Sequence, residues 1–315
     1  MAPSGAGGRT VGLITHPACL LHDNGPGHPE SPARLEAVRS RLEADVVSAG
    51  RGAWIEAPRA SDGDLALVHT AAHLARLERI EASGGGWLDP DTAVRPGSLE
   101  AARRAAGAAI LAAERAMHGE GASFCAVRPP GHHATPSSAM GFCLLSNAAI
   151  AARVALERLG AARVLIVDWD VHHGNGTADA VRDEPCIRYV SLHQWPFYPG
   201  TGLADDAGCG NLFHVPRPPG LEAATYVADL LAAVDRALAG FAPSLVIHSA
   251  GFDALLGDPI GGFTLEPADF ALVTREIAAR TPGVAVMSVM EGGYDPARMA
   301  EAAAQHVLAL GERGS

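Results

Sequence analysis

Short apolar runs alternate along this chain with longer alanine-rich stretches of helical periodicity. The runs at 164–167, 187–192, 244–248 and 284–290 are typical of strands buried on both faces of a sheet. Further strands are predicted at 11–15 and 123–127, and helices at 31–44, 98–117, 147–159, 221–238, 267–279 and 296–310. Because strands and helices alternate throughout, we predict an α/β fold whose parallel sheet is covered by helices on both faces. No shift in composition divides the chain, so we expect one domain over residues 11–315, after a flexible N-terminal segment 1–10.

Composition excludes several classes of protein. All 24 basic residues are arginine, which excludes Schiff-base, pyridoxal-phosphate and P-loop chemistry that depends on lysine. The formal net charge of −11 argues against a nucleic-acid binder. The 5 cysteines include no Cys-x-x-Cys pair, and we expect them to be reduced thiols in a cytoplasmic protein. No uncharged apolar stretch of about 18 residues occurs, so no membrane span is predicted.

Polar clusters follow four of the predicted strands. They lie at 128–133, 168–172, 249–253 and 291–294. In an open parallel sheet the ligand lies beyond the carboxyl ends of the strands. We therefore expect these four clusters to form one site.

The cluster after the strand at 164–167 reads Asp168-Trp-Asp-Val-His172. Residues two apart in extended chain point the same way, so Asp168, Asp170 and His172 can converge. Carboxylates and imidazoles are ordinary zinc ligands, and a catalytic zinc site needs about three protein ligands. Asp170 and His172 supply two, and Asp253, at the end of another strand, is a candidate for the third. The alternative interpretation of Asp-x-Asp after a strand is a helix cap or a turn.

Two adjacent histidines, His132 and His133, follow a rigid Pro-Pro-Gly turn. Imidazole titrates near neutrality, so the pair suits general acid–base work, although metal ligation is an alternative. Asp168 and Asn175 are the nearest candidates to orient them. A carboxylate partner favours imidazolium and an amide does not, so the two histidines would differ in basicity.

Tyr294 follows the glycine pair 292–293. Paired glycines allow the backbone to approach a site closely, and a phenol there can donate a hydrogen bond to a developing oxyanion. The alternative is a turn tyrosine whose hydroxyl lies in water.

Several motifs together resemble the zinc-dependent histone deacetylase family, in its class II-like and bacterial branch. They are Arg128-Pro-Pro-Gly-His-His-Ala134, Gly141-Phe-Cys143, Asp168-Trp-Asp-Val-His-His-Gly-Asn-Gly-Thr177, Pro199-Gly-Thr-Gly202, Ser249-Ala-Gly-Phe-Asp-Ala254, Gly257-Asp-Pro-Ile-Gly-Gly262 and Glu291-Gly-Gly-Tyr294. The resemblance implies an arginase/deacetylase-type fold of three αβα layers around a mostly parallel sheet. It also implies hydrolysis of an N-acetyl amide, with acetate released.

The resemblance also assigns roles to individual residues. It implies zinc on Asp170, His172 and Asp253, His133 as general base and acid beside His132, and Tyr294 on the carbonyl oxygen. It further implies a monovalent cation, usually potassium, near the zinc. The residues implied for that cation are Asp168, Asp170, His172, Ser191 and Leu192.

The family's substrate tunnel has counterparts here. Phe142 and Tyr198 match its two aromatic walls, and Ile260 matches a further tunnel position. Gly131, Gly141 and Gly293 match backbone positions near the tunnel, and Arg34 matches an arginine of the inner cavity. Two acids, Asp89 and Asp91, are candidates for the rim residue that holds the substrate backbone.

Three alternatives remain open at the level of sequence. The substrate is an acetyl-lysine side chain or, alternatively, an acetylated polyamine or other small amine. A ureohydrolase with two manganese ions would have a similar fold but needs more bridging carboxylates. A non-catalytic acyl-lysine binder should have lost a ligand, a histidine or the tyrosine, and none is lost. The sequence indicates no oligomeric state.

Overall fold

The computed structural model describes residues 10–312. The predicted N-terminal segment 1–10 therefore lies, except for Thr10, outside the described residues. In chain order the strands are β1 (Val11–Thr15), β2 (Gly52–Glu56), β3 (Gly86–Trp87), β4 (Ala93–Val94), β5 (Ser123–Cys125), β6 (Val164–Asp168), β7 (Ile187–Gln194), β8 (Leu212–Arg217), β9 (Leu245–Ala250) and β10 (Ala285–Met290). The α-helices are α1 (Pro32–Leu42), α2 (Asp62–Leu65), α3 (Ala71–Ala82), α4 (Ser98–Met117), α5 (Asn147–Arg158), α6 (Asn175–Val181), α7 (Ala223–Leu238), α8 (Pro267–Arg280) and α9 (Pro296–Gly311). A 3-10 helix, η1 (Pro17–Leu20), precedes α1, and a π-helix, η2 (Glu43–Val47), continues it.

Within residues 10–312, eight strands form one sheet in the order β2-β1-β5-β10-β9-β6-β7-β8. Every neighbouring pair in this sheet is parallel. The short strands β3 and β4 form a separate antiparallel pair. The predicted parallel α/β sheet is therefore confirmed.

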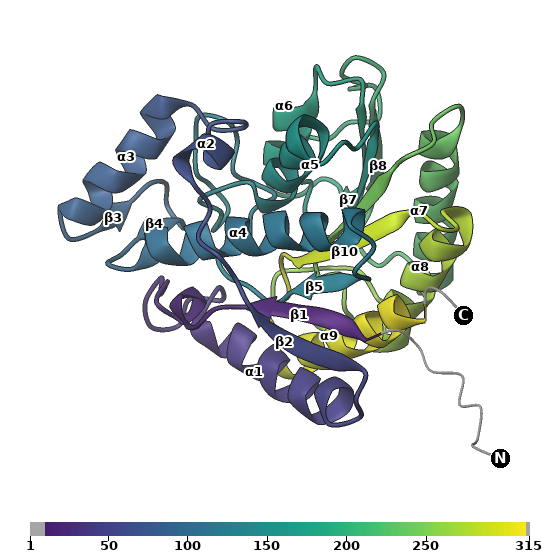
Figure 1. Ribbon diagram of the computed structural model, residues 1–315, viewed down its shortest axis with the longest axis horizontal. Coiled ribbons are helices and arrows are strands. Elements are labelled where there is room, and N and C mark those ends of the chain that lie inside the picture. Colours follow the sequence, from purple (N-terminus) through teal and green to yellow (C-terminus); the bar gives the residue numbers. More distant parts are fainter. Residues whose placement is uncertain (1–9, 313–315) are drawn as a thin grey trace.

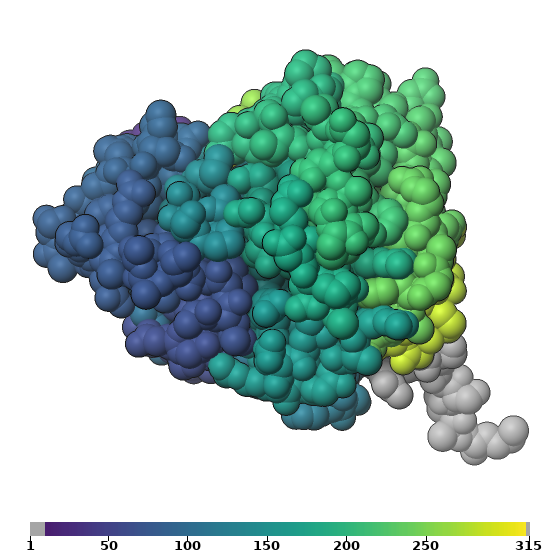
Figure 2. All heavy atoms as spheres, turned by 90° about the horizontal axis from the view of Figure 1, so that it is seen from above, coloured from purple at the N-terminus to yellow at the C-terminus, as the bar shows by residue number. Residues whose placement is uncertain are grey.

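Helices cover both faces of the sheet (Figure 1). Helices α4, α5 and α6 pack on one face, and α1, α9, α8 and α7 pack on the other. The central strands β6 and β9 are buried along their whole length, as their apolar sequences require. The result is the predicted three-layer αβα arrangement. In Figure 2 the segment that contains α3, in blue, forms one end of the molecule.

Two strands of the sheet were not predicted, β2 and β8, and they lie at its two edges. Both are only partly buried, so neither has a continuous apolar run. Strand β8 also contains Pro216, which cannot donate a ladder hydrogen bond and is tolerated at an edge. The predicted helix 31–44 is shorter than expected, because the backbone changes to the π-helix at Glu43.

The strands that end in polar clusters are neighbours in the sheet. Strands β5, β10, β9 and β6 lie side by side in that order, although they are far apart in sequence. Their carboxyl ends are in register, since Met290 pairs with Ala250 and Asp168 with Ser249. The fold therefore brings the four clusters to one edge of the sheet.

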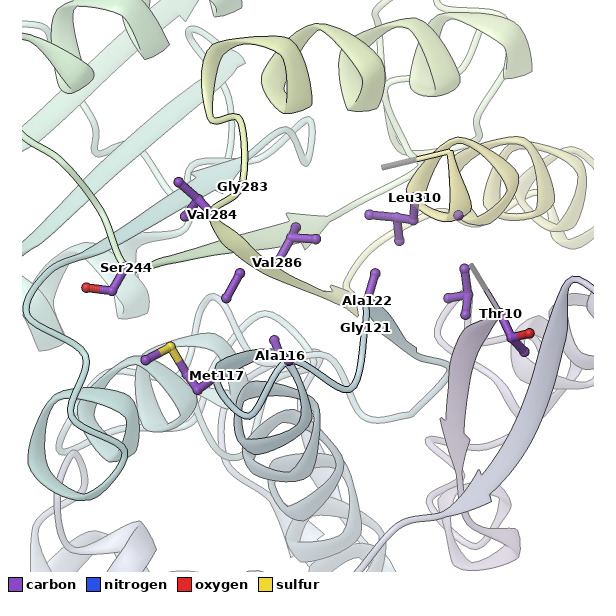
Figure 3. A pocket seen from close by; sticks show the side chains of 14 residues that line it. Thr10, Ala116, Met117, Gly121, Ala122, Ser244, Gly283, Val284, Val286 and Leu310 are labelled. Atoms are coloured by element: carbon purple, nitrogen blue, oxygen red, sulfur yellow. The ribbon is translucent and has the colours of Figure 1, made fainter. Parts of the chain in front are cut away.

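A cavity of about 550 Å³ lies at the opposite edge, near the start of β1 and the ends of α4 and α9 (Figure 3). Its lining includes Thr10, Met117 and Ser244 and no titratable side chain. Chemistry is therefore expected at the other edge. Among residues 10–312 no helix has both the length and the apolar character needed to cross a membrane.

Candidate active site

Asp170, His172 and Asp253 meet beyond the ends of β6 and β9. One ligand atom from each lies within 4.8 Å of the others, and all three side chains are buried. The Nδ1 atom of His172 lies 3.0 Å from Asp170 Oδ1 and 3.3 Å from Asp253 Oδ2. The structure thus brings together the three residues that the sequence suggested as zinc ligands.

The surroundings of this triad fit a metal ion. Within residues 10–312 the buried Asp253 Oδ2 atom has no hydrogen-bond partner, although His172 Nδ1 lies 3.3 Å from it. A Cβ added at Gly292 would collide with Asp253 Oδ2 and lie 2.5 Å from Asp170 Oδ2, so this wall must be glycine. Burial, and then the neighbouring Asp170, raises the pKa of Asp253 to about 7. Two carboxylates and one imidazole that share a buried, negatively charged pocket are a donor set suited to zinc.

Backbone amides fix both carboxylates of the triad. Asp253 Oδ1 accepts a hydrogen bond from the Val171 amide at 2.8 Å, and Asp170 Oδ2 accepts one from the Gly292 amide at 2.8 Å. These bonds orient the ligand oxygens before any ion arrives, as outer partners of metal ligands commonly do.

His132 and His133 have different partners. The Nδ1 atom of His132 lies 3.2 Å from Asp168 Oδ2, whereas the Nδ1 atom of His133 lies 2.8 Å from Asn175 Oδ1. The two ring centroids are 4.0 Å apart. Each imidazole therefore has the orienting partner that the sequence suggested.

The partners give the two imidazoles opposite pKa shifts. Burial lowers the pKa of His132, but the carboxylates of Asp170 and Asp168 outweigh it and raise the pKa to about 10. Burial, and then the charge of His132, lowers the pKa of His133 well below its ordinary value. One histidine is thus held as a cation and the other as a neutral base.

The tautomer of His133 follows from its partner. An amide oxygen can only accept, so Nδ1 of His133 carries the proton that it donates to Asn175 Oδ1. The Nε2 atom therefore keeps a free lone pair. The amide nitrogen of Asn175 is directed to Met140 Sδ at 3.4 Å, which supports this orientation of the side chain.

Asp168 has a further partner that the sequence did not indicate. The hydroxyl of Tyr189, on β7, donates to Asp168 Oδ2 at 2.8 Å. Asp168 Oδ1 accepts from the Asp170 amide at 3.1 Å. The carboxylate is therefore held rigidly between the histidine pair and the metal triad.

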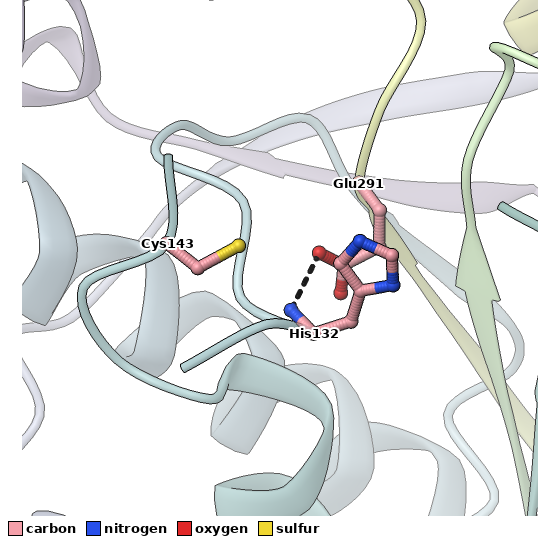
Figure 4. Close-up of side chains that lie close together, drawn as sticks. All are labelled: His132, Cys143 and Glu291. Atoms are coloured by element: carbon pink, nitrogen blue, oxygen red, sulfur yellow. Dashed lines mark hydrogen bonds between the residues drawn. The ribbon is translucent and has the colours of Figure 1, made fainter. Parts of the chain in front are cut away.

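Glu291, at the end of β10, is a second residue to which sequence reasoning gave no role. Its Oε2 atom accepts from the amides of Gly131 at 2.6 Å and His132 at 3.1 Å, and the latter bond is drawn in Figure 4. Its Oε1 atom accepts from Ser249 Oγ at 3.1 Å. Glu291 thus attaches the histidine turn to the sheet. The contact joins residues about 160 positions apart, so the local sequence contains no signal for it.

Cys143 lies beside His132 and Glu291, and ligand atoms of the three approach within 4.8 Å (Figure 4). The geometry does not favour a second metal. Both ring nitrogens of His132 face carboxylates of the site, at Asp168 and Asp170. Burial, and then Glu291, raises the pKa of the Cys143 thiol well above its ordinary value, so it stays protonated.

Tyr294 follows β10 and is nearly buried, with 9% of its surface exposed. Its amide donates to Asp258 Oδ2 at 2.7 Å. The guanidinium carbon of Arg34 lies 4.6 Å from the centre of its ring. Burial raises the pKa of the phenol well above its ordinary value, so the hydroxyl keeps its proton and can donate.

Arg34 also holds the loop that carries Tyr294. Its Nε atom donates to the Gly293 carbonyl at 2.6 Å and its Nη2 atom to the Glu291 carbonyl at 2.5 Å. Glu30 accepts from Arg34 at 3.0 Å and from Arg128 at 2.5 Å, and all three side chains are buried. The sequence matched Arg34 but assigned no role to Glu30 or to Arg128, although Arg128 begins one of the predicted polar clusters.

Two aromatic rings stand over the site. The ring of Tyr198 lies edge-on to His133 at 5.1 Å, and the ring of Phe142 lies edge-on to Tyr294 at 5.8 Å. Phe142 has a φ of 67°, unusual for a side chain of this size. A Cβ at Gly141 would collide with the His133 ring. The ring of Phe197, which sequence reasoning missed, stacks on His172 at 5.1 Å.

The other predicted positions lie around this centre. Ile260 is tied to the site through Asp258, which accepts from its amide at 3.0 Å and also from the Tyr294 amide. Asp89 Oδ1 accepts from two amides of its own turn. Burial, and then Asp91 and Asp89, raises the pKa of Tyr198, so both carboxyl groups lie near the aromatic rim.

Ser191 and Leu192, the residues implied for a monovalent cation, lie on β7 and are buried. Strand β7 pairs with β6, and Ser191 is the register partner of Asp168. The two strands thus place Ser191 next to Asp168.

Comparisons with known proteins agree with this geometry. A family model described as a histone deacetylase domain matches residues 28–310. A histone deacetylase-like amidohydrolase of Pseudomonas aeruginosa is 39% identical over 305 residues, which cover 89% of this chain and 80% of the relative. A probable deacetylase of Methanothermobacter thermautotrophicus is 38% identical over 292 residues, covering 90% and 86%. The solved HD domain of HDA15 superposes with a TM-score of 0.91 and 36% identity, covering 95% of this chain and 90% of that one.

Proposed function

Because this chain belongs to the histone deacetylase family, we propose that it is a zinc-dependent amidohydrolase that removes acetyl groups from acetyl-lysine side chains or related acetylated amines. The family assignment makes it a deacetylase-type hydrolase. One observation carries the finer proposal: the buried triad of Asp170, His172 and Asp253 lies beside two histidines, one paired with a carboxylate and the other with an amide oxygen. We further propose that residues 11–315 form a single deacetylase domain.

In this proposal Asp170, His172 and Asp253 hold the zinc ion. When bound, zinc polarises the acetyl carbonyl and lowers the pKa of a nearby water. The Nε2 lone pair of His133 accepts a proton from the attacking water. The Tyr294 hydroxyl donates a hydrogen bond to the oxyanion that forms.

Proton return completes the reaction. His133, once protonated, gives its proton to the leaving amine, and acetate is released. His132 stays cationic against Asp168 and stabilises the negative charge of the transition state. Asn175 keeps His133 in the tautomer whose Nε2 atom has a lone pair for the proton.

The aromatic pair Phe142 and Tyr198 would line the tunnel for the aliphatic part of the substrate. Asp91 is the better candidate for the rim acid, because Asp89 Oδ1 accepts two amides of its turn at 3.0 and 2.6 Å, whereas Asp91 Oδ1 accepts one longer bond, from the Thr92 hydroxyl at 3.2 Å. A monovalent cation, potassium in our proposal, would lie near Asp168 with oxygens of Ser191 and Leu192. The five cysteines are all free thiols, which supports a reducing, cytoplasmic location.

The substrate is tested by one panel of acetyl donors compared by kcat/KM. It contains acetyl-lysine peptides, longer acyl-lysine peptides, acetylputrescine and acetylspermidine. We expect the acetyl-lysine peptides to be preferred, because Ile260 does not supply a carboxylate for a second amine. A preference of about tenfold or more for free polyamines would overturn this order.

A further inference from the structure

The imidazole of His69 connects the two ends of the loop at residues 135–146. His69 is buried and lies between α2 and α3. Its Nδ1 atom lies 3.1 Å from the Thr135 carbonyl oxygen, and its Nε2 atom lies 2.9 Å from the Ser146 amide nitrogen. One rigid ring therefore spans the start and the end of this loop.

The two bonds determine the protonation of the ring. The Ser146 amide can only donate, so Nε2 of His69 must offer a lone pair. The Thr135 carbonyl can only accept, so Nδ1 must carry the proton. Neutral imidazole meets both demands with one tautomer. Phenylalanine would keep a ring at this position but could bond to neither backbone group, and the Ser146 amide would be left buried without this partner.

Neighbouring residues fasten the same loop. The Thr70 amide donates to the Pro136 carbonyl at 2.8 Å. His73 Nε2 donates to the Leu144 carbonyl at 3.0 Å, and the rings of His69 and His73 are 4.9 Å apart. Residues 69–73, before and at the start of α3, therefore hold the loop through several hydrogen bonds.

The loop carries parts of the active site at its tip. Phe142 is a wall of the tunnel in our proposal and contacts the Tyr294 ring. Gly141 lies against the His133 ring, and Met140 Sδ is the neighbour of the Asn175 amide. A displacement of the loop would therefore move the tunnel wall and the support of the catalytic base together.

We propose that His69 is a positioning residue for deacetylation, which fixes the 135–146 loop and through it Phe142 and the His133–Asn175 pair. The role in the reaction rests on the proposed function, whereas the closure of the loop does not. Misplacement of reacting groups by about 1 Å can lower a rate by about 10²-fold. Loss of the ring's two bonds should therefore reduce catalysis as well as stability.

The test compares His69→Phe with a matched control, Asn211→Ala. Asn211 is also buried, and its side-chain nitrogen bonds to the carbonyls of Val181, Glu184 and Ile187, so it closes a different loop. Amide hydrogen exchange, thermal unfolding, zinc content and the separate values of kcat and KM are measured for each protein.

In His69→Phe we expect amide exchange within residues 136–146 to accelerate at least about tenfold, because both hydrogen bonds of the ring are lost. We expect kcat/KM on an acetyl-lysine peptide to fall about tenfold to hundredfold with zinc still bound. Asn211→Ala should lower the melting temperature without changing amide exchange within residues 136–146 or kcat/KM. His69→Gln, whose amide can both donate and accept, should lie between wild type and His69→Phe, and it serves as the test variant if His69→Phe does not fold.

Unchanged exchange in the 136–146 region would overturn the proposal. An equal loss of kcat/KM in Asn211→Ala would also overturn it, because general destabilisation would then explain the effect. If no acetylated substrate is turned over by any form, the proposed function fails, and the exchange data still decide whether His69 closes the loop.

Discussion

Replacing Tyr294 by phenylalanine removes one hydroxyl group and so tests its contribution alone. The ring would keep its contacts, since the Arg34 guanidinium lies 4.6 Å from its centre and the Phe142 ring lies 5.8 Å away. The backbone bond from the Tyr294 amide to Asp258 does not involve the side chain. The change therefore removes the hydrogen-bond donor and leaves the loop in place.

The expected loss is large because the hydroxyl is buried and protonated. One donor to an oxyanion contributes about 3–4 kcal/mol, which corresponds to a fall in kcat of roughly 10²–10³-fold. Acetate release from an acetyl-lysine peptide gives kcat, and elemental analysis of the same sample gives the zinc content. We expect zinc content and melting temperature to be unchanged.

Tyr226→Phe is the matched control. It removes a buried hydroxyl that donates to the Trp169 carbonyl at 3.0 Å. It should cost about 1 kcal/mol of unfolding free energy and change kcat by less than about threefold. If Tyr294→Phe retains full turnover with zinc bound, the oxyanion role is wrong.

Three further predictions follow from the structure. Gly292→Ala places a methyl group against Asp253 Oδ2 and Asp170 Oδ2, so zinc affinity should fall by at least about tenfold when measured against a chelator. The control is Gly63→Ala, whose added Cβ makes only ordinary van der Waals contacts and should leave zinc affinity unchanged. Burial lowers the pKa of His306 to about 3, so as the pH falls below 6.5 the unfolded chain binds a proton that the folded protein does not. Between pH 7 and 5 the free energy of unfolding should therefore drop by about 2 kcal/mol more in wild type than in His306→Gln. Equal drops in the two proteins, measured by urea titration, would contradict this. Asp91→Asn should raise KM for an acetyl-lysine peptide more than it lowers kcat, and an effect confined to Asp89→Asn would reverse our assignment of the rim acid.

The central strands of the fold were predictable and its edges were not. Strands β6 and β9 have continuous apolar sequences because helices cover them on both faces, so the sequence records their environment directly. Strands β2 and β8 lie at the edges, where side chains are mixed and Pro216 is tolerated. Nothing in such a segment distinguishes a strand from a loop.

The candidate site was likewise predictable from the sequence only in part. Asp170, His172 and Asp253 were identifiable because each lies at the end of a recognisable strand, and the histidine turn has a distinctive motif. Glu291 and Glu30 were given no role, because the histidine turn lies about 160 positions from Glu291 and Arg128 lies 98 positions from Glu30. Only the packed sheet shows that one carboxylate holds the histidine turn and the other holds two buried arginines.

The metal dependence of acetate release tests the central claim most directly. Metal-stripped protein is titrated with zinc, and bound zinc and acetate released from an acetyl-lysine peptide are measured in the same samples, beside Asp253→Asn. We predict that activity rises in proportion to bound zinc and levels off at one ion per chain, and that Asp253→Asn neither binds zinc tightly nor releases acetate. Full acetate release by the metal-free protein, or a requirement for two manganese ions per chain, would contradict the account.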